Sequence, residues 1–336
     1  MRIAVDAMGG DYAPREIVRG AVEAARRLPA VSRILLVGDA EAVRRELGPD
    51  LPASDKIEVR HAAEVVGMDE SPAQAVRRKK DSSIGRAVDM VHSGEADAAV
   101  SAGNTGAFVV AATLKLGRLP GVERPAIAAV LPTQNRPFVL VDAGANTDCT
   151  AGLLFQFAVM GSVYSRVILG QRAPVVGLLS IGGEDVKGNE LTKEAFGLLS
   201  GSHLNFKGNV EGHDLFVGET DVAVCDGFVG NVVLKTSESA ARAIGHWMKQ
   251  EFRRNPVRVL GALLLSGALK AMRRRMDPEM YGGAPLLGVN GICIITHGAS
   301  TARAVFHAIR VASEAVEQKL NELIVGQITE EMSRTK

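Results

Sequence analysis

Five short turns rich in glycine and polar residues follow apolar runs in this chain, and they hold most of the side chains suited to chemistry. The clearest is Ser-Ala-Gly-Asn-Thr-Gly at 101–106, between the apolar run 98–100 and residues at helical spacing through Leu116. A turn from strand to helix points unpaired backbone N–H groups and the positive end of the helix at one place. That geometry favours phosphate or another anion. The alternative is an ordinary N-cap, in which Asn104 closes the helix end without a ligand.

The other four turns begin at 142, 180, 226 and 296, each after a run that predicts a buried strand. In open α/β sheets, ligands bind outside the carboxyl ends of the strands. We therefore interpret the five turns together as an active site. The candidate catalytic residues are Lys187, Asn231, Lys235, His297 and Asp226. The candidate substrate-binding residues are Ser101, Gly103, Asn104, Thr105, Gly106, Asp142, Asn146, Asn189 and Gly227.

These residue types suit an anionic nucleophile or a developing oxyanion, because lysines, amides and helix N-termini all stabilise negative charge. The sequence has no Walker lysine motif, no GxSxG elbow, no HExxH and no cysteine beside a histidine, so covalent catalysis by serine or cysteine is unsupported. Three candidates also have a structural explanation: Asn231 as a helix cap, Lys187 as a solvated side chain and His297 as a buried imidazole. We interpret the HxxxxD spacing of His92 and Asp97 as chance.

The 336 residues are 46% hydrophobic with a net charge of +1, which predicts a large core and argues against a protein coated in nucleic acid. Cys149, Cys225 and Cys293 lie far apart, so they predict a reducing cytoplasm and no metal site. A strand is expected directly at the N-terminus without a signal peptide, and no apolar run reaches the ~18 residues of a membrane span. The glycines at 9–10 lack the GxGxxG spacing of a dinucleotide site.

The alternation of apolar runs and turns predicts a layered α/β fold, as one unit over 1–336 or as two lobes. Aromatic residues make up only 4%, which fits the Ala/Val/Leu/Ile core of such folds. Strands are predicted at 3–7, 34–37, 57–61, 98–100, 126–131, 137–142, 175–179, 222–225 and 292–295. Helices are predicted at 14–28, 40–47, 83–92, 105–116, 149–167 and 302–320, and further helices start near 72 and 229.

A basic and apolar stretch at 252–276 departs from this pattern, and Asn255-Pro256 breaks the long helix before it. We expect a helical hairpin arm within 238–285. Its leucines are too apolar for a free exposed helix, so one interpretation is a dimer interface or a lid packed on the core. The other is an interfacial helix whose leucines enter a membrane while its arginines meet anionic lipids. The residues expected to contact a membrane or a partner are Arg258, Leu263, Leu264, Lys270, Arg273 and Arg274.

Several long motifs resemble those of the PlsX family of bacterial phosphate acyltransferases, nearly from end to end of the chain. They are DAMGGDYAP at 6–14, SAGNTGA at 101–107, DAGAN at 142–146, IGGEDVKGNE at 181–190, CDGFVGNVVLK at 225–235, YGGAPLLGVNG at 281–291 and THGAS at 296–300. The resemblance implies transfer of a fatty acyl group from acyl carrier protein to inorganic phosphate, giving an acyl-phosphate for the synthesis of phosphatidic acid. It also implies a homodimer and a three-layer α/β/α sandwich with a mainly parallel sheet, like that of the isocitrate and isopropylmalate dehydrogenases, but with no cofactor.

In such a reaction phosphate is itself the nucleophile, so the enzyme must bind the dianion, align it with the thioester carbonyl and stabilise the oxyanion. On this resemblance, Asn104, Thr105 and Gly106 would hold phosphate. Lys187 and Asn231 would polarise the carbonyl or support the oxyanion.

Lys235 or His297 would stabilise or protonate the departing thiolate, and Asp226 would orient a neighbour. The basic arm would meet the acidic carrier protein, an anionic membrane and the downstream membrane acyltransferase, and no nucleic acid is expected. These partners imply a cytoplasmic protein attached peripherally to the membrane. The alternatives are an NAD-dependent dehydrogenase of the same fold and a non-enzymatic adaptor between carrier protein and membrane.

Overall fold

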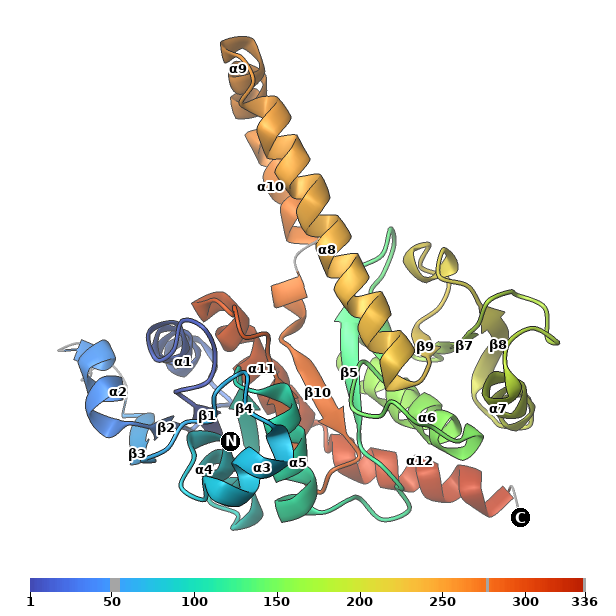
Figure 1. The fold of residues 1–336 in the computed structure, drawn as a ribbon, viewed down its shortest axis with the longest axis horizontal. Helices are drawn as coiled ribbons and strands as arrows, with labels where there is room; N and C mark the ends of the chain where they lie inside the picture. Colours follow the sequence, from blue (N-terminus) through green and yellow to red (C-terminus); the bar gives the residue numbers. More distant parts are fainter. Residues whose placement is uncertain (49–54, 276–277, 335–336) are drawn as a thin grey trace.

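The computed structural model describes residues 1–48, 55–275 and 278–334, and it shows a three-layer α/β/α body with a long helical arm (Figure 1). One sheet of eleven strands runs through the described part of the chain. Its strands, in spatial order, are β3 (Ile57–His61), β2 (Arg33–Gly38), β1 (Arg2–Asp6), β4 (Ala98–Ser101), β11 (Ile292–Ile295), β10 (Ala284–Leu287), β5 (Ala126–Leu131), β6 (Phe138–Val141), β9 (Val222–Val224), β7 (Val175–Leu179) and β8 (Asn205–Val210).

Helices cover both faces of the sheet, and each layer buries its apolar face in its own core cluster. One layer holds α1 (Arg15–Arg27), α2 (Ala40–Leu47), α6 (Ala151–Ile168), α7 (Glu190–Ser200), α11 (Ala302–Glu317) and α12 (Leu320–Arg334). The other holds α3 (Pro72–Arg78), α4 (Ser83–His92), α5 (Thr105–Leu116) and the start of α8 (Gly227–Phe252). The described residues also include two short 3-10 helices, η2 (Asp214–Phe216) and η3 (Pro278–Tyr281). The predicted sandwich is confirmed.

The strands form two parallel groups of opposite sense. β3, β2, β1, β4 and β11 pair in parallel, and so do β6, β9, β7 and β8. Between them, β10 is antiparallel to β11 and β5, and β5 is antiparallel to β6. The turns at 101 and 296 therefore lie at one end of the strand ladder and those at 142, 180 and 226 at the other, so the expectation of one shared end is wrong.

Most predicted elements are present, with three omissions and one division. The sequence interpretation missed α7, β8 and β10. The predicted closing helix is two helices, α11 and α12, because the chain turns at Lys319, whose φ is 53°.

The apolar helix α6 is long enough to cross a membrane by length and composition, contrary to the expectation that no such run exists. Its 18-residue window is 78% buried, in the core between the sheet and helices α7 and α12. Packing inside the body therefore accounts for its apolar side chains.

The arm consists of the distal part of α8 with α9 (Pro256–Leu264) and α10 (Ser266–Arg275), and it projects away from the body (Figure 1). α9 packs mainly on α8 and α10 and buries none of its residues. Leu263 is 66% exposed and Leu264 80% exposed. The lid packed on the core is therefore wrong for this chain, and the apolar face of α9 has no partner within its described residues.

Candidate active site

The loop after β6 is built around the buried carboxylate of Asp142. This carboxylate accepts hydrogen bonds from the backbone N–H groups of Ile127 (3.0 Å), Gly144 (3.1 Å) and Asn146 (2.7 Å), and from the side-chain amide of Asn146 (2.9 Å). Burial raises the pKa of Asp142 above its ordinary value, and these hydrogen bonds oppose the shift. Asp142 and Asn146 therefore hold the loop in shape, and their polar groups are occupied by the protein.

The N-terminus of α8 is pressed against this loop. The Gly227 N–H donates to the Asn146 carbonyl at 2.6 Å, and Asp226 caps the helix by accepting from the Val229 N–H at 2.9 Å. A Cβ on Gly230 would lie 1.9 Å from the Asp142 carbonyl oxygen, so only glycine permits this approach. Asn231 is exposed. It lies beside the loop, because a Cβ on Gly144 would be 3.5 Å from the Asn231 Cβ. The cap is Asp226, so Asn231 is not explained as a helix cap.

Lys187 belongs to the same end of the sheet, because it follows β7, the neighbour of β9. Its loop is anchored where the Asn209 amide donates to the Glu184 carbonyl at 2.8 Å, and Asn189 caps α7 by accepting from the Thr192 N–H at 2.9 Å. Lys187 is exposed, as expected if it is a solvated side chain.

Lys235 lies further along α8, exposed and paired with Glu238 at 3.4 Å.

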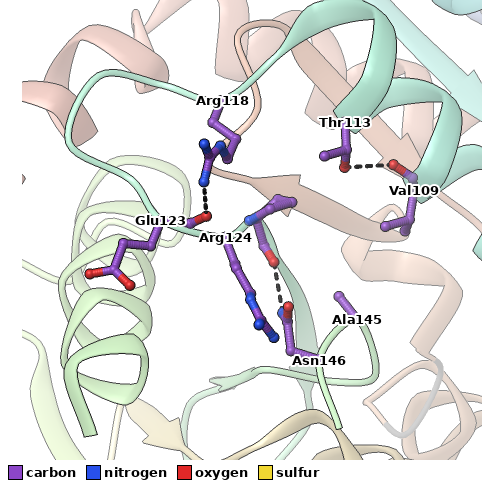
Figure 2. A pocket seen from close by; sticks show the side chains of 8 residues that line it. Val109, Thr113, Arg118, Glu123, Arg124, Ala145 and Asn146 are labelled. Atoms are coloured by element: carbon purple, nitrogen blue, oxygen red, sulfur yellow. Dashed lines mark hydrogen bonds between the residues drawn. The ribbon is translucent and has the colours of Figure 1, made fainter. Parts of the chain in front are cut away.

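A cavity of ≈ 370 Å³ opens beside this group (Figure 2). Val109 and Thr113 of α5 form one wall, and Ala145 and Asn146 of the β6 loop form another. The connection from α5 to β5 closes the third side with Arg118, Glu123, Arg124 and Pro125. This volume lies within the range of about 300–1,000 Å³ typical of small-molecule sites. Sequence reasoning missed the two arginines, which look like ordinary loop charges.

The second group of predicted residues lies at the other end of the ladder, around the turn after β4. His297 is held there because β11 pairs with β4 and the Thr296 N–H donates to the Ser101 carbonyl at 2.8 Å. His297 is exposed, so its interpretation as a buried imidazole is wrong; its Nδ1 accepts from the Ala299 N–H at 3.1 Å. The structure therefore separates this group from Lys187 and Asn231 rather than bringing all candidates to one point.

The side chain of Asn104 joins the first turn of α5 to the segment before α3 by hydrogen bonds. Its Oδ1 accepts from the Ala107 N–H at 3.0 Å, and its amide donates to the carbonyls of Gly67, Met68 and Glu70 at 3.1–3.2 Å. The N-cap interpretation therefore holds for this side chain, whose polar atoms are all used. A Cβ on Gly106 would lie 2.5 Å from Pro72, so the N-terminus of α3 covers part of this helix end, while Thr105 stays exposed.

Asp6 is a fully buried acid that the candidate set omitted. It accepts from the Ser101 hydroxyl at 2.7 Å, and Gly9 and Gly103 pack directly over it. Ser101 in turn accepts from the Gly103 N–H at 3.0 Å. Burial raises the pKa of Asp6. The sequence could have indicated Asp6 as a candidate, since Asp6 starts a sixth turn of glycine and polar residues after the first strand.

The cysteines are poor nucleophiles in this environment. Burial raises the pKa of Cys149 to about 11 and that of Cys293 to about 12, and it also raises the pKa of Cys225. The thiols are thus protonated at neutral pH. Within the ranges that the structure describes, no group of three His, Cys, Asp or Glu side chains is placed to hold a metal ion.

The chain is similar to proteins of known kind over nearly all its length. A sequence family described as "Fatty acid synthesis protein" matches residues 1–323. A phosphate acyltransferase from Pelotomaculum thermopropionicum is 55% identical over 328 residues, which cover 98% of this chain and 95% of that relative.

Two solved structures share the fold at low sequence identity. A phosphotransacetylase from Streptococcus pyogenes is 20% identical with a TM-score of 0.60, over 94% of each chain. A 4-hydroxythreonine-4-phosphate dehydrogenase from Klebsiella pneumoniae is 14% identical with a TM-score of 0.51, over 94% of this chain and 99% of that one. Both acyltransferases and dehydrogenases therefore use this architecture.

Proposed function

The chain belongs to this family of fatty acid synthesis proteins and is a phosphate acyltransferase, and from that premise we propose that its acyl donor is a fatty acyl thioester of acyl carrier protein. The family description supports this donor, because fatty acid synthesis carries its growing chains as thioesters on that protein. The acyl-phosphate product is then an activated acyl group for the synthesis of phosphatidic acid. The dehydrogenase and adaptor alternatives are not retained, since a relative matching 98% of the chain is an acyltransferase.

The chemistry needs no covalent intermediate on the protein. A phosphate oxygen forms a bond to the thioester carbonyl carbon, the C–S bond breaks, and the departing thiolate takes up a proton. The protein supplies position and charge, which suits a site whose thiols are protonated.

We place the carbonyl at the first turns of α8. Asn231 is exposed there, and the exposed Lys187 lies on the loop after the neighbouring strand β7. Both would stabilise the oxyanion. Lys235, further along α8, would stabilise the departing thiolate. The Asp226 cap fixes the turn that carries Asn231, because its carboxylate holds the Val229 N–H at 2.9 Å.

The first turn of α5 is proposed to bind a substrate phosphate group other than the attacking one, because it lies at the other end of the strand ladder from Asn231. The first N–H groups of a helix have no partner within the helix, and Thr105 is exposed beside them. Asn104 contributes by holding this turn rather than by touching phosphate, because its amide is fully used. His297 lies at the same end of the sheet as the first turn of α5. Its proposed role in proton transfer is therefore placed at this end of the sheet.

The arm is proposed to bind partners. Exposed apolar side chains of α8, such as Val232 and Ile244, fit a second subunit toward the base, and Leu263 and Leu264 fit the apolar edge of a bilayer at the tip. Arg258 and Lys270 fit an anionic surface or the acidic carrier protein. The side chains of Arg273 and Arg274 lie outside the described part of the structure. This assembly would be a cytoplasmic homodimer attached peripherally to the membrane, where the downstream membrane acyltransferase takes the product.

The observation that carries the proposal is the match of almost the whole chain to phosphate acyltransferases within a fatty acid synthesis family. The test is thiol release from long-chain acyl carrier protein with phosphate varied. We expect release that saturates with phosphate and an acyl product that hydroxylamine traps. Thiol release without phosphate would show a thioesterase, and release only from other acyl thioesters would refute the proposed donor.

A further inference from the structure

The cavity beside the β6 loop carries two positive charges that no acidic side chain neutralises. Arg118 donates through Nη1 to the Glu123 carbonyl, and Arg124 donates through Nη1 to the Asp148 carbonyl at 3.1 Å. Within the described ranges, neither arginine forms an ion pair with a carboxylate. The carboxylate of Glu123 points away from the Arg124 guanidinium (Figure 2). Each guanidinium has five N–H donors, so most of its bonding capacity is unused.

The side-chain donors of Thr113 and Asn146 in the cavity are already used within the protein. The Thr113 hydroxyl donates to the Val109 carbonyl at 2.7 Å within α5. The Asn146 amide donates to the Pro125 carbonyl at 2.8 Å and to Asp142 at 2.9 Å. The side-chain hydrogen-bond donors left in the cavity are therefore those of the two guanidinium groups, and the Glu123 carboxylate in the same wall is turned away from Arg124. Planar cationic donors can hold a phosphate group by paired charge-assisted hydrogen bonds.

The position of the cavity connects it to the proposed reaction. Ala145 and Asn146 line it, and the same loop packs on the first turns of α8, where Gly227 donates to Asn146 and Asn231 lies beside Gly144. The β6 loop thus lies between a group bound in the cavity and the residues proposed to hold the carbonyl.

We propose that this cavity binds a phosphate group of a substrate through Arg118 and Arg124. The inference rests on the proposed function, in which phosphate occurs twice: as the acceptor, and as the ester on the pantetheine arm that carries the acyl chain. The first turn of α5 accounts for only one of these groups. Both sources share the same recognition chemistry, and the substrates can be varied separately.

The test uses Arg118→Gln, Arg124→Gln and the double variant, with Arg172→Gln as the control. Arg172 is an exposed arginine between α6 and β7, away from the cavity. Initial rates are measured with phosphate varied, and then with two small donors, acyl-4′-phosphopantetheine and acyl-pantetheine, which differ only in the phosphate ester. Loss of a charge-assisted pair is expected to change the affected KM by about 10-fold or more, with kcat within about 3-fold.

Two results would support the proposal. A raised KM for inorganic phosphate with both donors assigns the acceptor to the cavity. Loss of the parent's preference for the phosphorylated donor, with the KM for phosphate unchanged, assigns the donor ester. Arg124→Lys should recover part of either effect, because lysine keeps the charge but not the planar pair. If the arginine variants match Arg172→Gln in every constant, the proposal is wrong.

A binding measurement separates this inference from the proposed function. Calorimetry with inorganic phosphate, 4′-phosphopantetheine and pantetheine requires no turnover. If the parent forms no acyl-phosphate but binds a phosphorylated probe in a manner lost in Arg124→Gln, the proposed function fails and the subsite stands. If the parent binds neither phosphorylated probe better than pantetheine, the subsite fails.

Discussion

Replacing Gly230 with alanine should separate α8 from the β6 loop and damage catalysis far more than stability. The added Cβ would lie 1.9 Å from the Asp142 carbonyl oxygen, while ordinary contact begins at 3.4 Å, so the two groups must move apart by about 1.5 Å. That displacement shifts Asn231 relative to the cavity lined by Asn146. A misplacement of about 1 Å can cost about 100-fold in rate, so we expect kcat/KM to fall by about that factor.

The matched control is Gly245→Ala, which is the same substitution on the same helix. A Cβ at Gly245 has no neighbour within 4 Å, so the control gains only the helix preference of alanine over glycine, up to about 1 kcal/mol. Overpacking typically costs about 1–3 kcal/mol, so we expect Gly230→Ala to lie about 2 kcal/mol below the control in free energy of unfolding. Phosphate-dependent thiol release and urea unfolding measure the two quantities. If Gly230→Ala keeps parental kcat/KM and gains stability as Gly245→Ala does, the close packing described here is refuted.

Three further predictions concern the site and the arm. Asn231→Ala and Lys187→Ala should each lower kcat by about 100-fold with the fold intact, as loss of an oxyanion donor does; near-normal turnover would remove both from that role. Leu264→Glu should weaken binding to anionic liposomes while soluble turnover stays within about 2-fold, because Leu264 is 80% exposed on a helix that buries none of its residues; equal binding by variant and parent would count against the membrane role, and loss of the dimer would favour the interface. With its pKa raised to about 11, Cys149 should be alkylated slowly at neutral pH and faster as pH rises toward that value, and Cys149→Ala should retain activity; fast labelling at neutral pH would contradict the protonated thiol.

Local features of the fold were readable from the sequence because each leaves a pattern within a short window. The apolar runs of β4, β5 and β7 end in glycine and polar turns, and Asn255-Pro256 marks the break at the tip of the arm. The strand β10 left no such pattern, since it is four residues long and contains Pro285. Its antiparallel pairing with both β11 and β5 leaves β5 running in the same sense as β11. The antiparallel pair of β5 and β6 then reverses the other half of the sheet, so the five turns do not share one end.

The site shows the same division between local and distant information. The cap at Asn104 lies next to the helix it closes, so the sequence indicates it, whereas the caps at Asp226 and Asn189 were missed. The partners of the Asn104 amide lie more than thirty residues away at Gly67, Met68 and Glu70, and no local pattern shows that this amide is already used. Arg118 and Arg124 line one cavity because α5, the β6 loop and the connection that leads into β5 meet around them.

The central claim is that phosphate attacks the thioester directly, without an acyl group on the protein. The most direct measurement mixes enzyme and long-chain acyl carrier protein at comparable concentrations without phosphate, and follows free thiol and the intact mass of the enzyme before and after phosphate is added. Direct attack predicts no thiol and no added mass until phosphate arrives, and then one acyl-phosphate for each thiol released. A burst of thiol equal to the enzyme, with an acyl group added to its mass before phosphate is present, would contradict it.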